Sequence, residues 1–596
     1  MYNCLYRFTN RLESERCLKH KTWHNYCNDI SKGGQMMSTR LSGTPWWDDL
    51  LDHPDIFTPE DLTEDEIMIA KTTEKFVEQQ ILPNVESLEQ HDYQMERETF
   101  AAAGELGLLA IEIPEAYGGL ELGKHVAGLV AENIGNGGGS FSVAYNIHAG
   151  VGTSPYINYG NEEQKQKYLS QLGSGAWVGA YALTEPSAGS DALKGKAKAI
   201  WNEEKNAWIL KGEKQWITNA NLAQVYVVFA NTEAGITAFI VEREMDGLSV
   251  GPEEKKMGIK GTSTATLILD ELAVPQENVL GEIGKGHKIA MNTLNLARLK
   301  LSFANLGTAK RALELTVKYG KERKQFQQHL VDFPMIKEKI ANMNIAIFGV
   351  ESLVYQTAAR IDDALEKNSE QHSSKVVGQF IAECATGKIQ GSEVLAAVAD
   401  EAVQIHGGYG FMQEYEVERI YRDARISRLF EGTNEINRLA VAKALFSQFR
   451  DQPSEKQNGN NRNAMFILEA ERHFAEILKA LAAMPREDVL EAQEFSRLVA
   501  NIYKEISIMR AVYLRAEKAG SGASLKQLMT DVICEEGYDN VERDLIRLWS
   551  AVDDGAEGNE MIERIRARAH VPAVENLLKK KRDISEYVVN AEKYQT

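Results

Sequence analysis

The sequence lacks the marks of a membrane-spanning, secreted or nucleic-acid-binding protein. No apolar run reaches the roughly 18 residues that a transmembrane helix needs. The N-terminus has no uninterrupted apolar segment of the kind found in secretory signals. Positively charged residues are also outnumbered: the chain has 86 Asp and Glu but 67 Lys and Arg, and its formal net charge is −19. Binding to nucleic acid needs clustered cations, so no nucleic-acid partner is expected.

Cysteine is scarce as well, with five among 596 residues. Only Cys384 and Cys534 lie beyond residue 40, and they are far apart in the sequence. No disulfide framework follows, and a reducing compartment is expected. Four residues near the N-terminus have spacings that could bind zinc, namely Cys17, His20, His24 and Cys27. Chance clustering in an unstructured tail explains them better, and we assign no metal.

The first 36 residues differ from the rest, because they are rich in Arg, Lys, His, Cys and Asn and have no structural period. One interpretation is a mitochondrial transit peptide, but such peptides are poor in acids and this segment contains Glu13, Glu15 and Asp29. In the other, residues 32–34, just before Met36, translate a purine-rich bacterial ribosome-binding site. We favour the second hypothesis, which predicts a bacterial cytoplasmic protein. The first would predict a mitochondrial one.

The pattern of the chain predicts an α+β multidomain protein. Thr63 and Glu66 have the spacing of a capping box before a helical stretch. The helical period gives way to β-branched and aromatic runs, which include a hairpin over 199–210, and then returns. No βαβ repeat occurs, so a doubly wound nucleotide-binding sheet is not expected. The predicted order is an N-terminal tail (1–59), a helical domain (60–176), a strand-rich domain (177–284), a second helical domain (285–446), a linker (447–463) and a further helical domain (464–596).

Two segments near the start of the strand-rich region have the chemistry of a ligand site. In residues 182–191 (ALTEPSAGSD), Gly189 lets the backbone approach a ligand, and Thr184 and Ser190 supply hydroxyl groups. In residues 216–220 (WITNA), an aromatic ring precedes a hydroxyl by two positions and could flank a planar ligand. On composition alone, a polar turn and a core tryptophan explain these segments better.

Two further motifs lie in the second helical region. Residues 404–411 (QIHGGYGF) follow no strand, so they are not a dinucleotide fingerprint, and a glycine-rich loop between helices is the plain alternative. In residues 429–436 (LFEGTNEI), Glu431 follows two apolar residues and precedes a glycine. In an apolar pocket its pKa would be raised and it could act as a base, whereas most single glutamates lie on the surface.

The order and spacing of these motifs resemble the acyl-CoA dehydrogenase family from about residue 60 to 445. TEPSAGSD and QIHGGYGF, the latter followed by Glu414, Arg419 and Asp423, are similar to the two signature patterns of the family. The first pattern departs at its last position, Lys194. The block of about 130 residues at the C-terminus is similar to the extra helical domain of the very-long-chain branch. The resemblance implies a middle β-barrel-like domain between two helical ones, FAD bound noncovalently, and a homodimer.

The resemblance also assigns site residues. Contacts to FAD within one subunit are implied for Ala182, Leu183, Thr184, Trp216, Thr218, Thr433 and Glu435. Contacts to the FAD of a neighbouring subunit are implied for Arg323, Gln325, Phe326, Gln404, Gly407 and Gly408. Contacts to the substrate are implied for Ser190, Asn295, Arg298 and Gly432.

The implied reaction is the oxidation of a fatty acyl-CoA to a trans-2-enoyl-CoA in fatty acid β-oxidation. Glu431 would remove the α-proton, the β-hydrogen would leave as hydride to the flavin, and the electrons would pass to an electron-transferring flavoprotein. Some branches of the family place the base just before the arginine that matches Arg298. Here that position is Ala297, which cannot accept a proton and thus favours Glu431.

Three alternatives stay open at this stage: an acyl-CoA oxidase that uses O₂, a low-activity flavoprotein scaffold or assembly factor, and a flavin monooxygenase that would not need Glu431. The sequence does not give the acyl chain length, although Gly150 and Gly152 are expected to leave room near the acyl tail. The basic run 579–582 leaves peripheral membrane contact open, but a solvated helix end explains it better.

Overall fold

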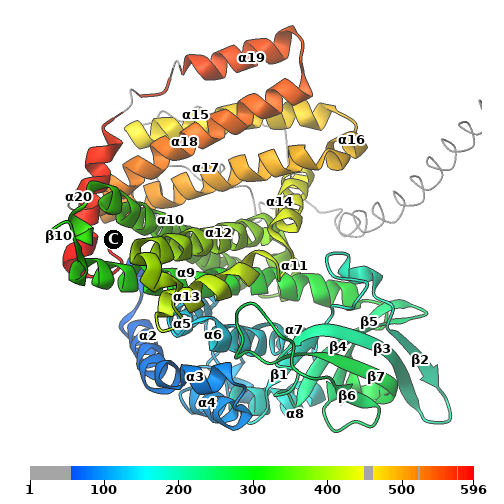
Figure 1. The fold of residues 1–596 in the computed structure, drawn as a ribbon. Coiled ribbons are helices and arrows are strands. Elements are labelled where there is room, and N and C mark those ends of the chain that lie inside the picture. The colour runs from blue at the N-terminus through cyan, green and yellow to red at the C-terminus, as the bar shows by residue number, and fades with distance from the viewer. Residues whose placement is uncertain (1–55, 449–460, 521, 523, 569, 573–574) are drawn as a thin grey trace, which may run out of the picture.

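The computed structural model describes residues 56–448 and 461–596, apart from residues 521, 523, 569, 573 and 574. A sheet domain lies between two helical regions, and a further helical block packs on the second of these (Figure 1). The α+β multidomain prediction is therefore confirmed. The N-terminal segment 1–36, the cysteine and histidine group within it, and most of the predicted linker fall outside the described residues.

The first helical region contains α2 (Glu64–Phe76), α3 (Val85–Glu89), α4 (Tyr93–Glu105), α5 (Lys124–Gly135), α6 (Gly139–Asn146), α7 (Ser154–Tyr159) and α8 (Glu162–Gly173). The predicted capping box at α2 is confirmed. The Thr63 hydroxyl accepts a hydrogen bond from the Glu66 N–H at 3.3 Å, and the Glu66 carboxylate accepts one from the Thr63 N–H at 2.8 Å. Phe76, Phe100 and Phe141 pack together in the core of this region.

The middle region is an eight-stranded sheet. Its strands are β1 (Gly179–Ala182), β2 (Lys198–Asn202), β3 (Ala207–Thr218), β4 (Val225–Thr232), β5 (Gly235–Glu242), β6 (Leu248–Val250), β7 (Thr264–Pro275) and β8 (Val279–Leu280). They pair in the order β6-β7-β3-β2-β4-β5-β8, with β1 parallel to β4. The predicted hairpin is confirmed as the antiparallel pair β2 and β3. Residues 225–230 of β4 are all buried, which explains why they form an unbroken apolar run.

The second helical region is built on three long helices, α9 (Gly286–Glu322), α10 (Pro334–Lys367) and α12 (Ile381–His406). The shorter helices are α11 (Ser373–Val377), α13 (Glu416–Ala424) and α14 (Asn434–Gln448), and β9 (Lys324–Gln325) pairs with β10 (Gln328–His329). Close approach between helices depends on glycine. A Cβ at Gly307 of α9 would lie 1.8 Å from the carbonyl oxygen of Glu132 in α5, so a side chain there would force the two helices apart.

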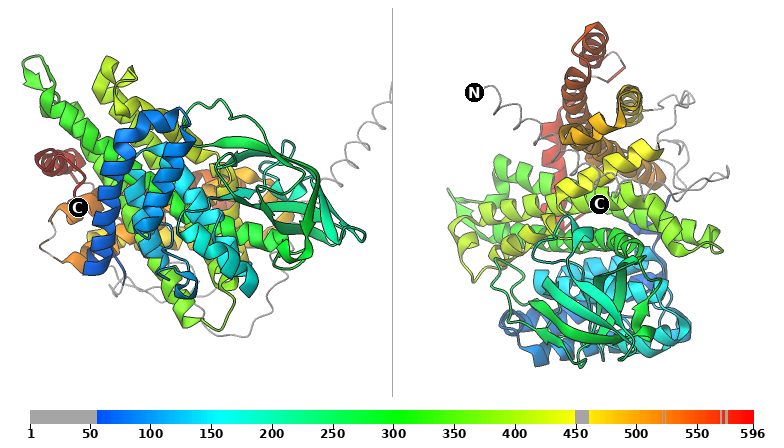
Figure 2. Two further views of the ribbon diagram at one scale, coloured as in Figure 1. Left: turned by 90° about the horizontal axis from the view of Figure 1, so that it is seen from below. Right: turned by 90° about the vertical axis from the view of Figure 1, so that its right-hand side faces the viewer.

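The C-terminal block contains α15 (Arg462–Ala483), α16 (Arg486–Glu491), α17 (Gln493–Ala519), α18 (Ser524–Val552), α19 (Ala556–Ala567) and α20 (Leu577–Ala591). It lies on the side of the second helical region that faces away from the sheet (Figures 1 and 2). Helix α17 packs on α10 and α14, and α20 packs on α10. The buried apolar side chains of the block and of the second helical region form one continuous core. No helix in the described part of the chain is both long and apolar enough to cross a membrane.

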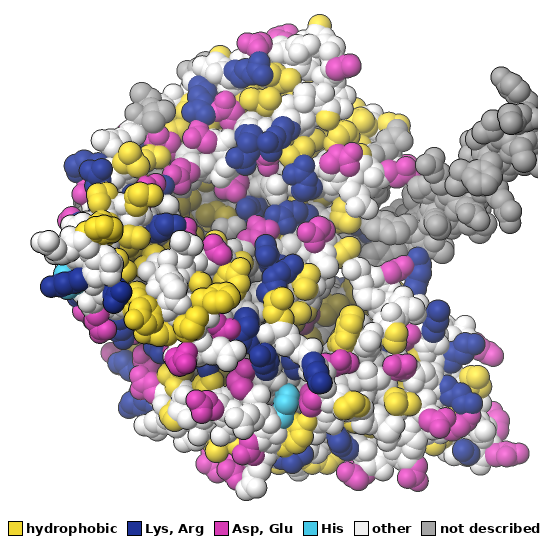
Figure 3. Space-filling model, viewed as in Figure 1, with side chains coloured by type: hydrophobic (Ala, Val, Ile, Leu, Met, Phe, Trp, Pro, Cys, Tyr) yellow, Lys and Arg dark blue, Asp and Glu magenta, His cyan; other side chains and the backbone are white. Residues whose placement is uncertain are grey.

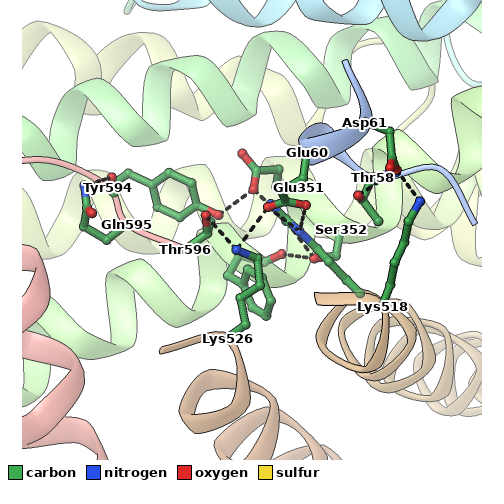
Figure 4. Close-up of polar contacts among 12 residues, drawn as sticks. Thr58, Glu60, Asp61, Glu351, Ser352, Lys518, Lys526, Tyr594, Gln595 and Thr596 are labelled. Atoms are coloured by element: carbon green, nitrogen blue, oxygen red, sulfur yellow. Dashed lines mark hydrogen bonds and ion pairs between the residues drawn. The ribbon is translucent and has the colours of Figure 1, made fainter. Parts of the chain in front are cut away.

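A buried ionic cluster joins the ends of the described chain to its centre (Figure 4). Arg515 of α17 is 1% exposed and donates to Glu351 of α10 at 2.7 Å and to Glu60, just before α2, at 2.6 Å. The Tyr594 hydroxyl donates to the same Glu351 carboxylate at 2.7 Å. Burial acts to raise the pKa of Glu351, but the neighbouring charges of Lys310 and Arg515 outweigh it and lower that pKa to about 2. The cluster therefore fixes the C-terminal block on the rest of the protein.

Candidate active site

Glu431 lies in a tight loop between a 3₁₀ turn (Arg425–Arg428) and α14. Its φ is +55°, and that of Gly432 is +82°. A left-handed conformation costs a non-glycine residue roughly 1–2 kcal/mol, so the surroundings must hold Glu431 in place. Such backbone strain is concentrated at functional sites in proteins.

Three side chains hold the loop by its carbonyl oxygens. Arg298 of α9 donates from Nε to the Glu431 oxygen at 3.1 Å. Asn437 of α14 donates to the oxygens of Gly432 at 2.7 Å and of Thr433 at 3.0 Å. Lys388 of α12 donates to the Gly432 oxygen at 2.9 Å. The loop is therefore tied to α9, α12 and α14 at once, which fixes the direction of the Glu431 side chain.

Glu431 is half-buried, and its Oε2 atom is buried with no hydrogen-bond partner in the structure. Burial raises the pKa of this carboxyl, while the charges of Arg298 and Lys388 act to lower it. A carboxylate without hydrogen bonds is a strong proton acceptor, because no donor stabilises its charged form. Glu431 therefore has the properties of a general base.

A cavity begins beside Glu431 and runs along α9 between the two helical regions. Near Glu431 its wall is apolar, with Phe430, Ala297 and Leu301. Farther along, the wall also contains polar groups, among them Asn305 and Asp423. The span from Ala297 to Thr308 along α9 is about 16 Å at the rise of an α-helix. The part of the cavity beside Glu431 can therefore take an apolar group.

The expectation that Gly150 and Gly152 leave room for this chain is only partly right. Gly152 packs on the backbone of β1, since a Cβ there would lie 2.9 Å from the carbonyl carbon of Gly179. Gly150 lines a second, smaller cavity, which shares Ala297 with the first. The first cavity is bounded instead by Val143 and Ile147.

The ends of β1 and β3 form the opposite side of the site. The Gln215 N–H donates to the Thr184 oxygen at 2.9 Å, which brings Ala182, Leu183 and Thr184 beside Trp216 and Thr218. A buried ion pair of 2.6 Å between Lys214 and Glu185 locks the two segments together. Ser190 is exposed in the loop that follows β1. In β1, burial raises the pKa of Tyr181, and the charge of Glu431 raises it further.

The residues at this edge fit a planar cofactor. The Trp216 side chain is 59% exposed although it lies at the end of a sheet, and its φ is +58°. A large aromatic ring held out in this way offers a face for stacking, since aromatic rings pack by offset or edge contacts. Thr433 and Glu435 lie at the start of α14, directly after Glu431. The geometry thus permits the implied FAD contacts of Trp216, Thr218, Thr433 and Glu435.

The other implied FAD contacts lie far from Glu431. Arg323, Gln325 and Phe326 follow the end of α9, and Gln404, Gly407 and Gly408 lie at the end of α12. The two groups meet, because Arg323 lies over the ring of Tyr409 at 5.4 Å and Tyr319 stacks on His406 at 4.2 Å. From Arg298 to Arg323 the rise of α9 is about 37 Å. These residues therefore form a second group, separate from the site at Glu431.

This second group lies in an exposed apolar patch. Phe326 is 89% exposed, and large apolar side chains are also exposed at Met335, Tyr409, Phe411 and Met412 in the same group of segments. Figure 3 shows apolar side chains gathered over the region of β10 and α13. Contiguous apolar surface of this kind is typical of a protein–protein interface.

The structure brings together Glu431, Gly432, Asn295 and Arg298, since Arg298 also donates to the Asn295 side chain at 3.4 Å. Sequence reasoning missed Lys388, Asn437 and Tyr181. No signal in the sequence singles out Lys388, because the stretch 381–399 also contains Glu383, Gln390 and Glu393. Within the described residues, no three His, Cys, Asp or Glu side chains are grouped in a way that could hold a metal ion.

Family models match three consecutive parts of the chain. They are described as the acyl-CoA dehydrogenase N-terminal domain over residues 63–176, the middle domain over 180–272 and the C-terminal domain over 284–446. A probable acyl-CoA dehydrogenase of Bacillus subtilis (strain 168) is 40% identical over 95% of this chain and 99% of its own. The crystal structure of an acyl-CoA dehydrogenase complexed with FAD from Bacillus anthracis has a TM-score of 0.88 and 40% identity, and covers 92% of this chain and 98% of that one.

Human relatives match the chain less completely. The mitochondrial short-chain specific acyl-CoA dehydrogenase is 36% identical over 66% of this chain and 93% of its own. The mitochondrial very long-chain specific enzyme is 38% identical over 58% of this chain and 53% of its own. Because the two identities are nearly equal, similarity alone does not choose an acyl chain length.

Proposed function

Because this chain belongs to the acyl-CoA dehydrogenase family and is thus an FAD-dependent oxidoreductase, we propose that it converts a fatty acyl-CoA to its trans-2-enoyl-CoA with Glu431 as the base. The observation that carries the proposal is the Oε2 atom of Glu431, which is buried without a hydrogen-bond partner in a residue that lines a mostly apolar cavity. A carboxylate in that position can take a proton from a bound chain.

The residues around the site have different roles in the proposed reaction. The α-hydrogen of a thioester is a weak acid, so it must meet a base in surroundings free of water. Arg298, Asn437 and Lys388 hold the Glu431 loop, and Phe430 and Leu301 keep the cavity beside it apolar. Bound FAD would supply the acceptor for the β-hydrogen, which leaves as hydride. Ser190, Asn295, Arg298 and Gly432 are the residues proposed to contact the substrate.

The proposed cofactor site uses both groups of residues. Trp216, Thr218, Thr433 and Glu435, with Ala182, Leu183 and Thr184, would hold the FAD of their own subunit. The group at the end of α9 and α12 would reach the FAD of a second subunit, because about 37 Å along α9 separates it from its own Glu431. The apolar patch around Phe326 supports the same conclusion, and we propose a homodimer that buries it.

We further propose an electron-transferring flavoprotein as the electron acceptor, a role in fatty acid β-oxidation, and a cytoplasmic location. Membrane contact through the basic run is not part of the proposal. Lys580 pairs with Asp531 at 2.6 Å and Lys581 pairs with Glu536 at 2.6 Å, so these charges are already used within the C-terminal block.

The test is the variant Glu431→Gln, with Glu163→Gln as its control. Glu163 is an exposed glutamate of α8, so the control removes the same charge away from the site. We expect Glu431→Gln to retain the yellow cofactor and lose nearly all reduction of an electron-transferring flavoprotein, while Glu163→Gln keeps normal turnover. Normal turnover in Glu431→Gln would refute the proposal. The same assay distinguishes an acyl-CoA oxidase, which would produce peroxide without the flavoprotein.

A further inference from the structure

Lys388 is a buried cation that touches the catalytic loop. It lies in α12 and is 0% exposed. Its ammonium group donates to the Gly432 carbonyl oxygen at 2.9 Å and to the Asn434 side-chain oxygen at 2.8 Å. A buried ammonium costs several kcal/mol in solvation unless it is well paired, so an apolar side chain would fill this space at a lower free-energy cost. A functional role for the positive charge explains the presence of a lysine at this position.

A series of polar contacts continues from Lys388 to the C-terminal block. The Asn434 amide donates to Glu393 of α12 at 3.2 Å, and Arg438 of α14 donates to the same carboxylate at 2.8 Å. Arg438 also donates to the Asn501 side chain of α17 at 2.8 Å. The Asn501 amide then donates to Asp544 of α18 at 3.3 Å. Contacts thus run without a gap from the loop of Glu431 into two helices of the block.

We propose that Lys388 is a positioning residue for Glu431 and that α17 and α18 hold the catalytic loop in its working geometry through Arg438, Glu393 and Asn434. This inference rests on the proposed role of Glu431 as the base. Under this inference the C-terminal block contributes to catalysis. It holds α14 in place and so holds the loop of Glu431, which directly precedes that helix. A displacement of about 1 Å at a reacting group can lower a rate by roughly a hundredfold, so even a small shift of the loop is measurable.

The groups that face Lys388 set the expected pH dependence. Burial lowers the pKa of Lys388 to about 7; the charges of Glu431, Glu435 and Glu393 act to raise it, and that of Arg298 acts to lower it. The rate requires an ionised Glu431 and, under the proposal, a charged Lys388. Turnover is therefore expected to fall on the acid side as Glu431 becomes protonated, and on the alkaline side above about pH 7.

The first experiment compares Lys388→Met and Lys388→Arg in the FAD-loaded enzyme. Loss of the positive charge in Lys388→Met should lower kcat about ten- to a hundredfold with little change in KM, and should move the acid limb of the pH profile upward. Arginine stays charged at all relevant pH values, so Lys388→Arg should lose the alkaline limb. Unchanged kcat and an unchanged profile in both variants would overturn the proposal.

The second experiment tests the connection to the C-terminal block, and it does not depend on whether a Lys388 variant folds. We expect Asn501→Ala to lower kcat about tenfold with FAD content unchanged. The double variant Asn501→Asp with Asp544→Asn should recover most of that loss, because an acceptor for Arg438 and a hydrogen bond between positions 501 and 544 are both retained. Arg564→Ala in α19, which breaks a contact with Glu476, is the control.

The outcomes distinguish the proposed connection to the C-terminal block from the proposed role of Glu431 as the base. If Asn501→Ala has wild-type kcat, or if the double variant behaves no better than Asn501→Ala, the connection through α17 is wrong. Failure of the proposed function would look different, since Glu431→Gln would then remain active whatever the Lys388 and Asn501 variants do.

Discussion

Removal of the Arg515 side chain should destabilise the protein more than almost any other change in the C-terminal block. Arg515 is 1% exposed and pairs with both Glu351 and Glu60. In Arg515→Met a side chain of similar length remains, but the carboxylates of Glu351 and Glu60 each lose a charged partner. Glu351 keeps Lys310 and Tyr594, and Glu60 keeps Lys526 at 3.2 Å.

The pKa of Glu351 sets an upper limit on its share of the effect. A value of about 2 in place of 4.5 corresponds to about 3 kcal/mol of stabilisation of the charged form, and Lys310 and Arg515 supply it together. Loss of one partner of a buried pair typically costs about 3–5 kcal/mol, because the remaining charge is left in a poor solvent. The same shift gives a pH dependence. The contribution of Glu351 is present above the unfolded-state pKa near 4.5 and is lost as the pH falls toward 2.

Urea unfolding of the FAD-loaded protein, followed by circular dichroism, measures this effect. We expect the transition midpoint to fall in Arg515→Met and part of the loss to return when Glu351→Gln is added, because fewer charges are then left unpaired. Arg543→Met is the control, since this arginine of α18 is 52% exposed and its removal should cost less than about 0.5 kcal/mol. An Arg515→Met variant within 1 kcal/mol of the wild type would refute the reasoning.

Two further predictions concern the substrate and the dimer. Asn305 presents an unpaired amide nitrogen to the cavity beside Glu431, so Asn305→Leu should raise kcat/KM about fourfold for each extra methylene that the cavity then buries, measured over a series of straight-chain acyl-CoA substrates. An unchanged chain-length profile would contradict it. Phe326→Glu places a charge in the exposed apolar patch and should convert dimers to monomers in sedimentation velocity, whereas a variant that stays dimeric would show that the patch is not the interface.

Local features of the fold could be predicted from the sequence because local contacts cause them. The capping box at Thr63 depends on a partner three residues away, and the β2–β3 hairpin on strands joined by a short turn. The loop that carries Glu431 could be expected as well, because its glycine and the start of the next helix are contiguous in the chain, but the role of Glu431 came from the family resemblance and stays a prediction.

Contacts between distant segments could not be predicted in this way. Lys388 meets the oxygen of Gly432, 44 positions away, and Arg515 meets Glu60, 455 positions away. A lone lysine or arginine in a helical stretch has the same pattern whether it is exposed or buried, so only the packing of the helices reveals its partner. The polar end of the cavity has the same origin, because Asn305 and Asp423 come from different helices.

The length of α9 has a consequence for how defects combine. One continuous helix supports Arg298 at a subunit's own reaction centre and ends just before Arg323, which under the proposed dimer serves the centre of its neighbour. A subunit without Glu431 has no base in its own centre but still supplies Arg323 to the centre of its partner. A subunit without Arg323 keeps its own base but leaves the partner's FAD site incomplete. Two inactive chains of these two kinds, assembled together, would leave one of the two centres whole.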